Sequence, residues 1–173
     1  DSIIETGMSA RSDDGNRYYD RFRGRVMFPI RDGRGRCIAF GGRSLDPAAR
    51  AKYLNSPETP LFDKGRTLYN LAGARSAVGR AEPLIVTEGY MDVIALHSGN
   101  FSGAIAPLGT AITEQQLQSM WRVSPEPIIA LDGDKAGLRA AYRLIDLSLP
   151  LLKTGQALRF SLMPEGKDPD DLI

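Results

Sequence analysis

Acidic residues follow three short apolar runs of the chain, each at a point where a strand is expected to end. They are Glu88 after LIVT, Asp132 and Asp134 after IIAL, and Asp168, Asp170 and Asp171 after RFSLMP. If the runs are parallel strands of one sheet, these carboxylates collect at its carboxyl edge, where open α/β sheets bind ligands. Carboxylates so placed repel one another unless a cation lies between them, and their oxygens suit Mg²⁺ or Mn²⁺. A divalent metal held in this way indicates phosphate chemistry.

The order of segments in the second half of the chain predicts an α/β fold. Apolar runs predict strands at 83–88, 103–106, 127–132 and 157–163. Helices are predicted between them at 90–98, 113–121 and 136–149. Thr113 and Gln116 form a capping box at the start of the second helix. The apolar positions of the third follow helical spacing, at Leu138, Ala141, Tyr142, Ile145 and Leu149. Strands that alternate with helices predict a mostly parallel, Toprim-like sheet flanked by helices.

The first half of the chain predicts a small mixed α+β subdomain. RVMFPI and CIAFGG are expected to be two strands joined by RDGRG. Because Pro29 has no N–H to donate, the first strand is expected at the edge of its sheet. Residues 44–60 are expected to be a loop, and residues 67–78 a helix. We place the boundary near 79–83, which gives a basic template- and nucleotide-binding region at 1–80 and a metal-binding region at 81–173.

The charges are segregated along the chain. Residues 17–80 hold 14 Lys and Arg against 5 Asp and Glu, whereas residues 81–173 hold 7 against 12. A basic segment beside an acidic one suits an enzyme that grips a polyanion and acts on it with metals. The single cysteine, Cys37, excludes an internal disulfide and a Cys-based zinc site, and we expect its thiol to be buried. No apolar run approaches the roughly 20 residues of a membrane span, which fits a cytoplasmic protein.

The basic segment interleaves cations with aromatic and amide side chains. Arg21, Arg23 and Arg25 alternate, so an extended strand would present all three on one face. The other candidates for nucleotide or DNA binding are Arg43, Lys52, Tyr53, Asn55 and Lys64. Cations bind phosphates and an aromatic ring stacks on a base. A solvated charged surface is the alternative.

The motif DGDKAG has three alternatives to a metal site of this kind. An EF-hand loop fails at Ala136 and Arg143, which occupy ligand positions. A phospho-receiver domain would leave Glu88 and the basic segment unexplained. The aspartates could instead cap the following helix, and Asp134 could do so while still binding metal. The chain has no P-loop motif, and its only histidine, His97, supports no Ser-His-Asp arrangement. Gly89 and Gly133 are expected to let the backbone approach a metal or phosphate closely.

Two groups of motifs resemble a known family. EGYMDV, DGDKAG and the later DPD resemble the Toprim domain shared by bacterial primases, type IA and II topoisomerases and some small nucleases. YDRFRGRVMFPIRD, IAFGGR, KYLNSPETPLF and KGRTLYNL resemble the basic subdomain of bacterial DnaG-type replicative primases. The resemblance covers about residues 18–173.

The resemblance implies synthesis of short RNA primers on single-stranded DNA from ribonucleoside triphosphates, for DNA replication. It implies a metal-binding set of Glu88, Asp92, Asp132, Asp134, Asp168 and Asp170, with Glu88, Asp132 and Asp134 catalytic. Members also carry a zinc-binding domain and a helicase-binding domain. We expect neither here, so the chain would be a core fragment without zinc, and its helicase contact would lie elsewhere. A Toprim nuclease, a topoisomerase fragment or a single-strand binding module are the alternatives.

Overall fold

The computed structural model describes residues 2–12, 14–109 and 111–173, except for the side chain of Asp170. It divides into two compact units, Asp1–Asp63 and Lys64–Ile173. The predicted regions 1–80 and 81–173 concern function and stay a prediction. The compact units, by contrast, group residues 64–80 with the second half of the chain. Among the described residues, no helix has the length and apolar character that crossing a membrane requires.

The first unit is built from short antiparallel strands. Its elements are α1 (Ser2–Glu5), β1 (Ser9–Arg11), β2 (Tyr18–Asp20), β3 (Arg25–Arg31), β4 (Cys37–Ser44) and β5 (Tyr53–Asn55). The strands β3 and β4 form the predicted hairpin, which turns at Gly35 with a φ of 83°. The sheet order β3-β4-β5 places Pro29 on an edge strand, as predicted. The strand β5 lies inside the segment that we expected to be a loop.

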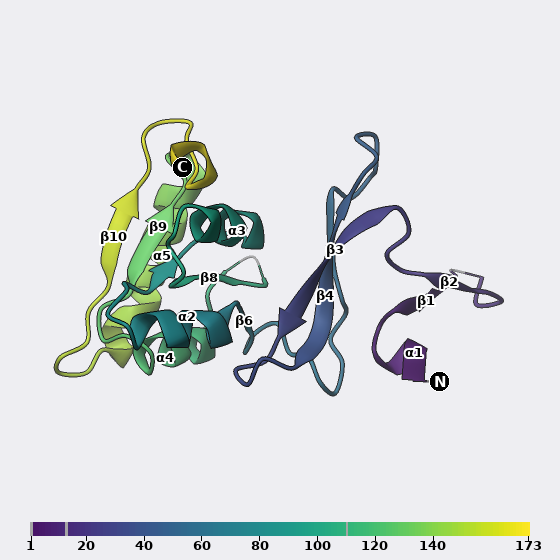
Figure 1. Cartoon of the computed structure of the whole chain (residues 1–173), viewed down its shortest axis with the longest axis horizontal. Helices are drawn as coiled ribbons and strands as arrows, with labels where there is room; N and C mark the ends of the chain where they lie inside the picture. Colours follow the sequence, from purple (N-terminus) through teal and green to yellow (C-terminus); the bar gives the residue numbers. More distant parts are fainter. Residues whose placement is uncertain (1, 13, 110) are drawn as a thin grey trace. The chain divides into compact units, whose positions relative to one another are not determined.

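The second unit is a five-stranded sheet in the order β10-β9-β7-β8-β6. Its strands are β6 (Leu68–Tyr69), β7 (Ile85–Val86), β8 (Ala104–Pro107), β9 (Ile128–Leu131) and β10 (Arg159–Leu162). The strands β7 to β10 run parallel, as predicted, and only β6 is antiparallel. Figure 1 shows this sheet between its helices. The helices are α2 (Leu71–Val78), α3 (Tyr90–Ser98), α4 (Glu114–Trp121) and α5 (Lys135–Ser148).

The core lies in two layers, one on each face of the sheet. Side chains of α2, α4 and α5 pack with Leu84, Val86, Ile105 and Ile129 in the larger layer. Side chains of α3 pack with Ile85, Ala104 and Ala130 in the smaller one. Successive strand residues thus face opposite layers, which explains why the sheet strands are apolar throughout. The capping box of Thr113 and Gln116 forms as predicted.

We expected residues 67–78 to form one helix, and this was wrong. They form β6 and then α2, with Asn70 between them at a φ of 60°. Asparagine tolerates this left-handed conformation better than most residues, and Asn70 Nδ2 donates to the carbonyl oxygen of Ala104 at 2.9 Å. This bond across to β8 makes Asn70 the junction between strand and helix. No local pattern in the sequence indicated it.

The expectation about the burial of Cys37 was wrong. The thiol of Cys37 is exposed, because Cys37 opens β4 beside the hairpin turn. The helix α5 forms nearly where predicted. Of the apolar positions with helical spacing, Ala141 is buried, whereas Leu138, Tyr142 and Leu149 are 43%, 62% and 63% exposed. The buried residues of the helix are Gly137, Ala141, Leu144 and Ser148. A Cβ at position 137 would overlap the carbonyl oxygen of Asp132, so small residues bring this face close to the sheet.

Candidate carboxylate site and candidate nucleic-acid surface

The parallel strands bring their acidic residues to one edge of the sheet. Glu88 follows β7, Asp132 follows β9 and Asp168 follows β10, and β9 lies between the other two strands. Burial, and to a smaller extent repulsion by the carboxylates of Glu88, Asp92, Asp168 and Asp134, raises the pKa of the Asp132 carboxyl to about 6. The predicted acids with described side chains therefore lie close enough together to sense one another's charge.

Asp132 occupies the centre of this carboxylate edge. Its backbone N–H donates to Glu88 Oε1 at 3.4 Å. Its Oδ1 atom is buried and has no hydrogen-bond partner among the described residues. A buried carboxylate oxygen without a donor suits a cation, because leaving it unsatisfied costs free energy. The carboxylate oxygens at this edge therefore fit a hard divalent ion.

The described side chains are not arranged as a finished coordination sphere. Within residues 2–12, 14–109 and 111–173, no three His, Cys, Asp or Glu side chains converge as metal ligands. The predicted ligand Asp170 begins a short 3₁₀ helix, Asp170–Leu172, and its side chain lies outside the described residues. The ligand set Glu88, Asp92, Asp132, Asp134, Asp168 and Asp170 thus stays a prediction.

Two of the acids also hold helix ends. Asp134 Oδ1 accepts hydrogen bonds from the N–H groups of Ala136 and Gly137, both at 2.7 Å, so it caps α5. Asp92 Oδ2 accepts from the N–H of Gly89 at 3.0 Å at the start of α3. The capping role left open for Asp134 is therefore present. Both bonds go to a single oxygen of Asp134, and its side chain is exposed.

Gly133 joins two of the acidic loops. Its N–H donates to the carbonyl oxygen of Lys167 at 2.9 Å, and its own carbonyl accepts from Gly166 at 3.2 Å. A Cβ at position 133 would overlap the Pro164 carbonyl oxygen. The close approach predicted for Gly133 is thus to a neighbouring loop of the chain. At Gly89 the nearest atom to a Cβ would be 3.6 Å away, and its φ of −140° suits any residue.

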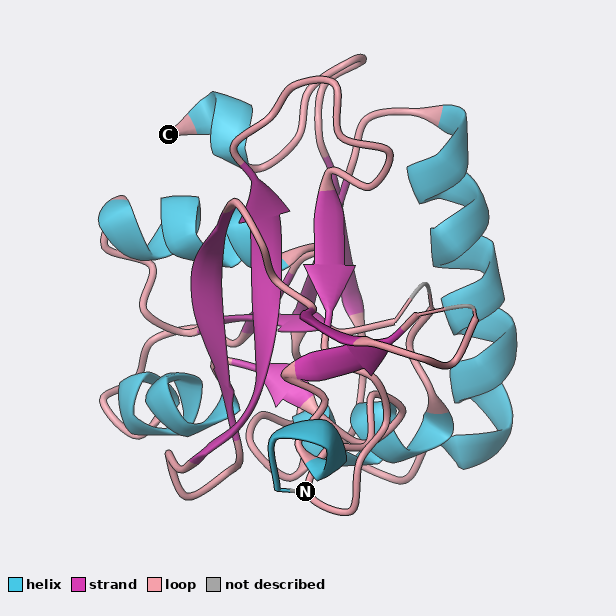
Figure 2. Cartoon of the chain, turned by 90° about the vertical axis from the view of Figure 1, so that its right-hand side faces the viewer, coloured by secondary structure: helices cyan, strands magenta, loops and turns pink. Residues whose placement is uncertain are grey.

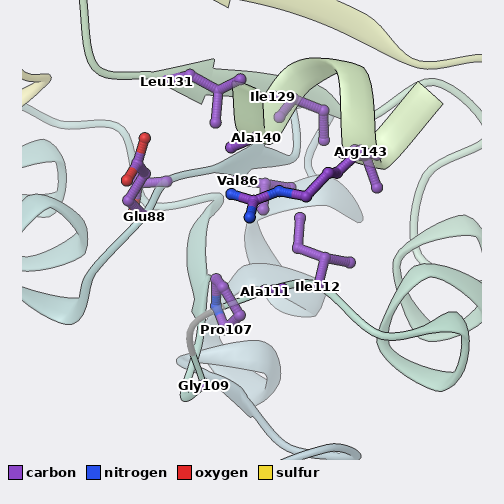
Figure 3. Close-up of a pocket in the computed structure, with 12 residues that line it drawn as sticks. Val86, Glu88, Pro107, Gly109, Ala111, Ile112, Ile129, Leu131, Ala140 and Arg143 are labelled. Atoms are coloured by element: carbon purple, nitrogen blue, oxygen red, sulfur yellow. The ribbon is translucent and has the colours of Figure 1, made fainter. Parts of the chain in front are cut away.

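A pocket of about 280 Å³ lies beside Glu88 on the face of the sheet that α5 covers. Figure 3 shows the Arg143 side chain reaching across it, between Glu88 and the segment that contains Pro107 and Gly109. The walls are mostly apolar and include Val86, Ile129, Leu131, Ala140 and Leu144. Sequence reasoning missed Arg143 as a neighbour of the carboxylate edge. The one signal for it was its position nine residues after Asp134, on the same helix.

The prediction that Arg21, Arg23 and Arg25 lie on one face of an extended strand is wrong. Arg21 and Arg23 lie in a turn at 21–24, which Gly24 closes with a φ of 62°, and Arg25 opens β3. The Arg25 guanidinium donates to the carbonyl oxygens of Ala51, Lys52 and Gly42, at 2.9, 3.2 and 3.3 Å. It therefore holds the backbone that leads into β5.

Arg21 and Arg23 make different contacts from Arg25. Arg21 Nε donates to the carbonyl oxygen of Asn55 at 3.3 Å. The Arg23 guanidinium carbon lies 5.3 Å from the centroid of the Tyr19 ring. Only Arg23 of the three is exposed. DNA binding by these arginines stays a prediction.

The strands β4 and β5 present the remaining candidates of the first unit together. Arg43 is paired with Tyr53, and Gly41 with Asn55. Directly opposite residues of an antiparallel pair point to the same face, so Arg43, Tyr53 and Asn55 share a face of the sheet. The Lys52 ammonium lies 5.6 Å from the centroid of the Tyr53 ring. Lys64, the last candidate, belongs to the second unit, where its carbonyl oxygen accepts from Gln116 Nε2 at 2.8 Å.

A mostly parallel sheet with helices on both faces and acids at its carboxyl edge is the architecture of a Toprim domain, and residues 82–160 match the family model of that domain. Residues 1–75 match the model of the DNA primase catalytic core, N-terminal domain. The chain belongs to the DnaG-type bacterial primase family, in the part that forms the catalytic core. A Toprim domain implies binding of a divalent metal.

Similar proteins agree along the whole chain. The DNA primase of Pseudomonas aeruginosa is 48% identical over 99% of this chain, and that of Escherichia coli is 49% identical over 99%. The chain spans only 26% and 29% of these relatives. A crystal structure of a DNA primase domain from Pseudomonas aeruginosa has a TM-score of 0.93 at 48% identity, with 99% of this chain and 53% of that chain covered. A DnaG primase catalytic domain bound to single-stranded DNA has a TM-score of 0.91 at 48% identity, with the same coverage.

Proposed function

We propose that this chain is the catalytic core of a DNA primase, which synthesises short RNA primers on single-stranded DNA from ribonucleoside triphosphates. The reaction is nucleotidyl transfer: the primer 3′-hydroxyl attacks the α-phosphate of a nucleotide, and pyrophosphate leaves. The observation that carries the proposal is the gathering of Glu88, Asp132 and Asp168 at one sheet edge, with a buried oxygen of Asp132 that lacks a donor among the described residues. Primases at 48–49% identity along the chain support it.

Glu88, Asp92, Asp132, Asp134, Asp168 and Asp170 would hold Mg²⁺ or Mn²⁺, with Glu88, Asp132 and Asp134 as the catalytic residues. Such an ion lowers the pKa of a hydroxyl and neutralises charge on phosphates. Asp134 keeps the start of α5 fixed through its cap, and Gly133 ties the central acids to the loop before Asp168. The chain thus supplies an edge of carboxylates at fixed positions.

The first unit would bind the polyanions. Tyr53 and Asn55 belong to β5, and Arg43 and Lys52 lie beside it. These four residues would contact template and triphosphate, together with Arg21 and Arg23 of the first unit and Lys64 of the second. Arg25 would contribute by holding the backbone of residues 51 and 52. One matched structure is described as bound to single-stranded DNA, which supports this partner. We include the RNA primer, the replicative helicase and a cytoplasmic location in the proposal for the whole protein.

The test is primer synthesis by the whole protein with Glu88→Gln or Asp132→Asn. We expect loss of primers at millimolar Mg²⁺ with folding retained, because both residues lie at strand ends outside the core. Glu114→Gln removes a carboxylate from the exposed first turn of α4 and serves as the matched control. DNA cleavage without primer synthesis would favour the Toprim nuclease or topoisomerase alternative. Normal primer yield from both variants would refute the assignment of the acids.

A further inference from the structure

The outer face of α5 carries a row of three cations, Lys135, Arg139 and Arg143. All three are exposed, and in the described part of the chain none of their side chains has a hydrogen bond or an ion pair. Two other cations of residues 81–173 are paired: Arg159 contacts Glu126 at 2.7 Å, and Lys167 contacts Asp171 at 3.8 Å. We call Lys135, Arg139 and Arg143 the α5 cationic face. It contrasts with the acidic balance of residues 81–173, which hold 7 basic against 12 acidic residues.

This arrangement costs helix stability. Residues four apart on a helix are neighbours, and like charges at this spacing destabilise it by a few tenths of a kcal/mol per pair. Lys135 is also the first residue of the helix, where the macrodipole disfavours a positive charge. An acid enters the outer face only at Asp146, near the other end. The row therefore has no function in stabilising α5, and an anionic partner would remove its cost.

The α5 cationic face begins at the carboxylate edge. Asp134 caps the helix, and Lys135 follows it directly. The three cations recur at intervals of about 6 Å along the helix axis, which makes a row of about 12 Å. At the far end of the row, Arg143 reaches over the pocket that Glu88 also lines (Figure 3). Figure 2 shows α5 as the long helix at the right, with its outer face on the molecular surface.

The surroundings of the row suit a nucleic-acid strand. A polyanion provides regularly spaced charges, which a row of evenly spaced cations can neutralise. Tyr142 is 62% exposed beside Arg139 and Arg143, and an exposed aromatic ring can stack on a base. Leu138, which is 43% exposed, adds an apolar contact on the same side.

We propose that the α5 cationic face binds the phosphodiester backbone of a nucleic-acid strand that occupies the carboxylate edge. The inference rests on the proposed function, because it takes the strand at the edge as the substrate or product of primer synthesis. The strand is either the DNA template or the RNA made on it, since both present the same phosphates. The face thus continues the track of the strand along the second unit.

The test compares two charge reversals that change the net charge equally. Arg139→Glu alters the α5 cationic face, whereas Arg122→Glu alters an exposed cation at the end of α4. Binding of the 173-residue chain to a fluorescent single-stranded DNA and to an RNA–DNA hybrid is measured at several salt concentrations. We expect Arg139→Glu to weaken binding about five- to tenfold and to make the slope of log K against log salt shallower by about 0.7. Arg122→Glu should change neither value, and Arg139→Lys should restore most of the affinity.

The outcomes separate the strands and the two proposals. A loss with DNA alone assigns the face to the template, and a loss confined to the hybrid assigns it to the RNA-containing duplex. Equal effects of Arg139→Glu and Arg122→Glu on both ligands would overturn the inference. Circular dichroism and thermal unfolding confirm that both variants keep their helices. If the whole protein makes no primers but Arg139→Glu still weakens binding selectively, the α5 cationic face stands and the proposed function fails.

Discussion

The two units fix their charged side chains by opposite means. In the second unit, the backbone places the acids: parallel strands end at one edge, and Gly133 packs against the Pro164 carbonyl. In the first unit, side chains place the backbone: Arg25 donates to three carbonyl oxygens, and Arg21 to one. The acids are crowded at their edge, while some of the arginines are occupied in holding β5.

This difference shows that a count of charges does not measure the charge available to a ligand. At the acidic edge, Asp132 Oδ1 remains available as an acceptor, because it has no described donor. Arg25 belongs to the same basic segment as Arg43, but its guanidinium is bonded within the unit, whereas Arg43 is exposed. The acidic edge should therefore respond to backbone changes, and the basic surface should depend on a few positioning side chains.

The largest effect is expected from Gly133→Ala. The new Cβ would overlap the Pro164 carbonyl oxygen, so the two loops must separate. We expect the free energy of unfolding to fall by about 3 kcal/mol, as for an overpacked site. Gly89→Ala is the matched control at the same edge, because a Cβ there has 3.6 Å to its nearest neighbour. Denaturant unfolding measures both. Equal stabilities of the two variants would contradict a backbone-fixed edge.

The second effect concerns Arg25, whose removal leaves three carbonyl oxygens without their donor. Arg25→Ala should lower the free energy of unfolding by about 1–2 kcal/mol and shift the amide resonances of Lys52 and Tyr53. Arg25→Lys keeps the charge but not the planar set of donors, so it should not restore either property. Arg43→Ala, on the neighbouring strand, should stay within about 0.5 kcal/mol of the parent. Full rescue by lysine would indicate that Arg25 acts through its charge alone.

The parallel sheet was predictable because its information is local and periodic. The apolar runs that end at Glu88 and Asp132 fixed the strands, and Thr113 with Gln116 fixed a helix start. Because parallel strands end at the same edge, the sequence also sufficed to place the acids together. The contact of Gly133 with the loop before Asp168 was not predicted, and the approach of its backbone to a metal or phosphate stays a prediction.

The remaining features depend on contacts between segments far apart in the chain. The strand β5 is only three residues long and exists through its pairing with β4. The burial of α5 on its small residues was hidden, because its larger apolar residues also follow helical spacing. The stripe at Arg21 to Arg25 failed because a glycine turn interrupts it. Helical spacing alone could not show that Arg143 reaches toward the carboxylate edge.

The third effect is a pH dependence of the metal-free protein. The folded pKa of Asp132 is about 6, above its ordinary value of 3.8. Between about pH 4 and pH 6 the unfolded chain releases this proton while the folded protein keeps it, so stability falls as pH rises through this window and then levels. Asp132 is half-buried, and solvent screening limits the loss to about 1 kcal/mol. Thermal unfolding with a chelator at pH 4, 5 and 7 measures it.

Asp132→Asn is the control for this pH dependence, because an amide does not titrate. We expect its melting temperature to change less than that of the parent between pH 4 and pH 7. The stability of the variant relative to the parent should therefore be higher at pH 7 than at pH 4. Added Mg²⁺ should stabilise the parent at pH 7 more than the variant. Identical pH profiles of the two proteins would show that neither burial nor the neighbouring acids raise the pKa of Asp132 in the folded protein.

The smallest effect tests whether Arg43 is as available as its exposure indicates. Each phosphate contact contributes roughly 0.7 to the slope of log K against log salt for single-stranded DNA. Arg43→Ala should therefore make the slope shallower by about that amount, with stability unchanged. Arg25→Ala should weaken binding by disturbing the backbone before Tyr53. For an equal loss of affinity, it should change the salt slope less than Arg43→Ala does. Fluorescence titrations of the two variants over a range of salt separate these cases. If the two variants show the same change in slope for the same loss of affinity, Arg25 contacts phosphate as Arg43 does. The contrast between free and occupied arginines then does not hold.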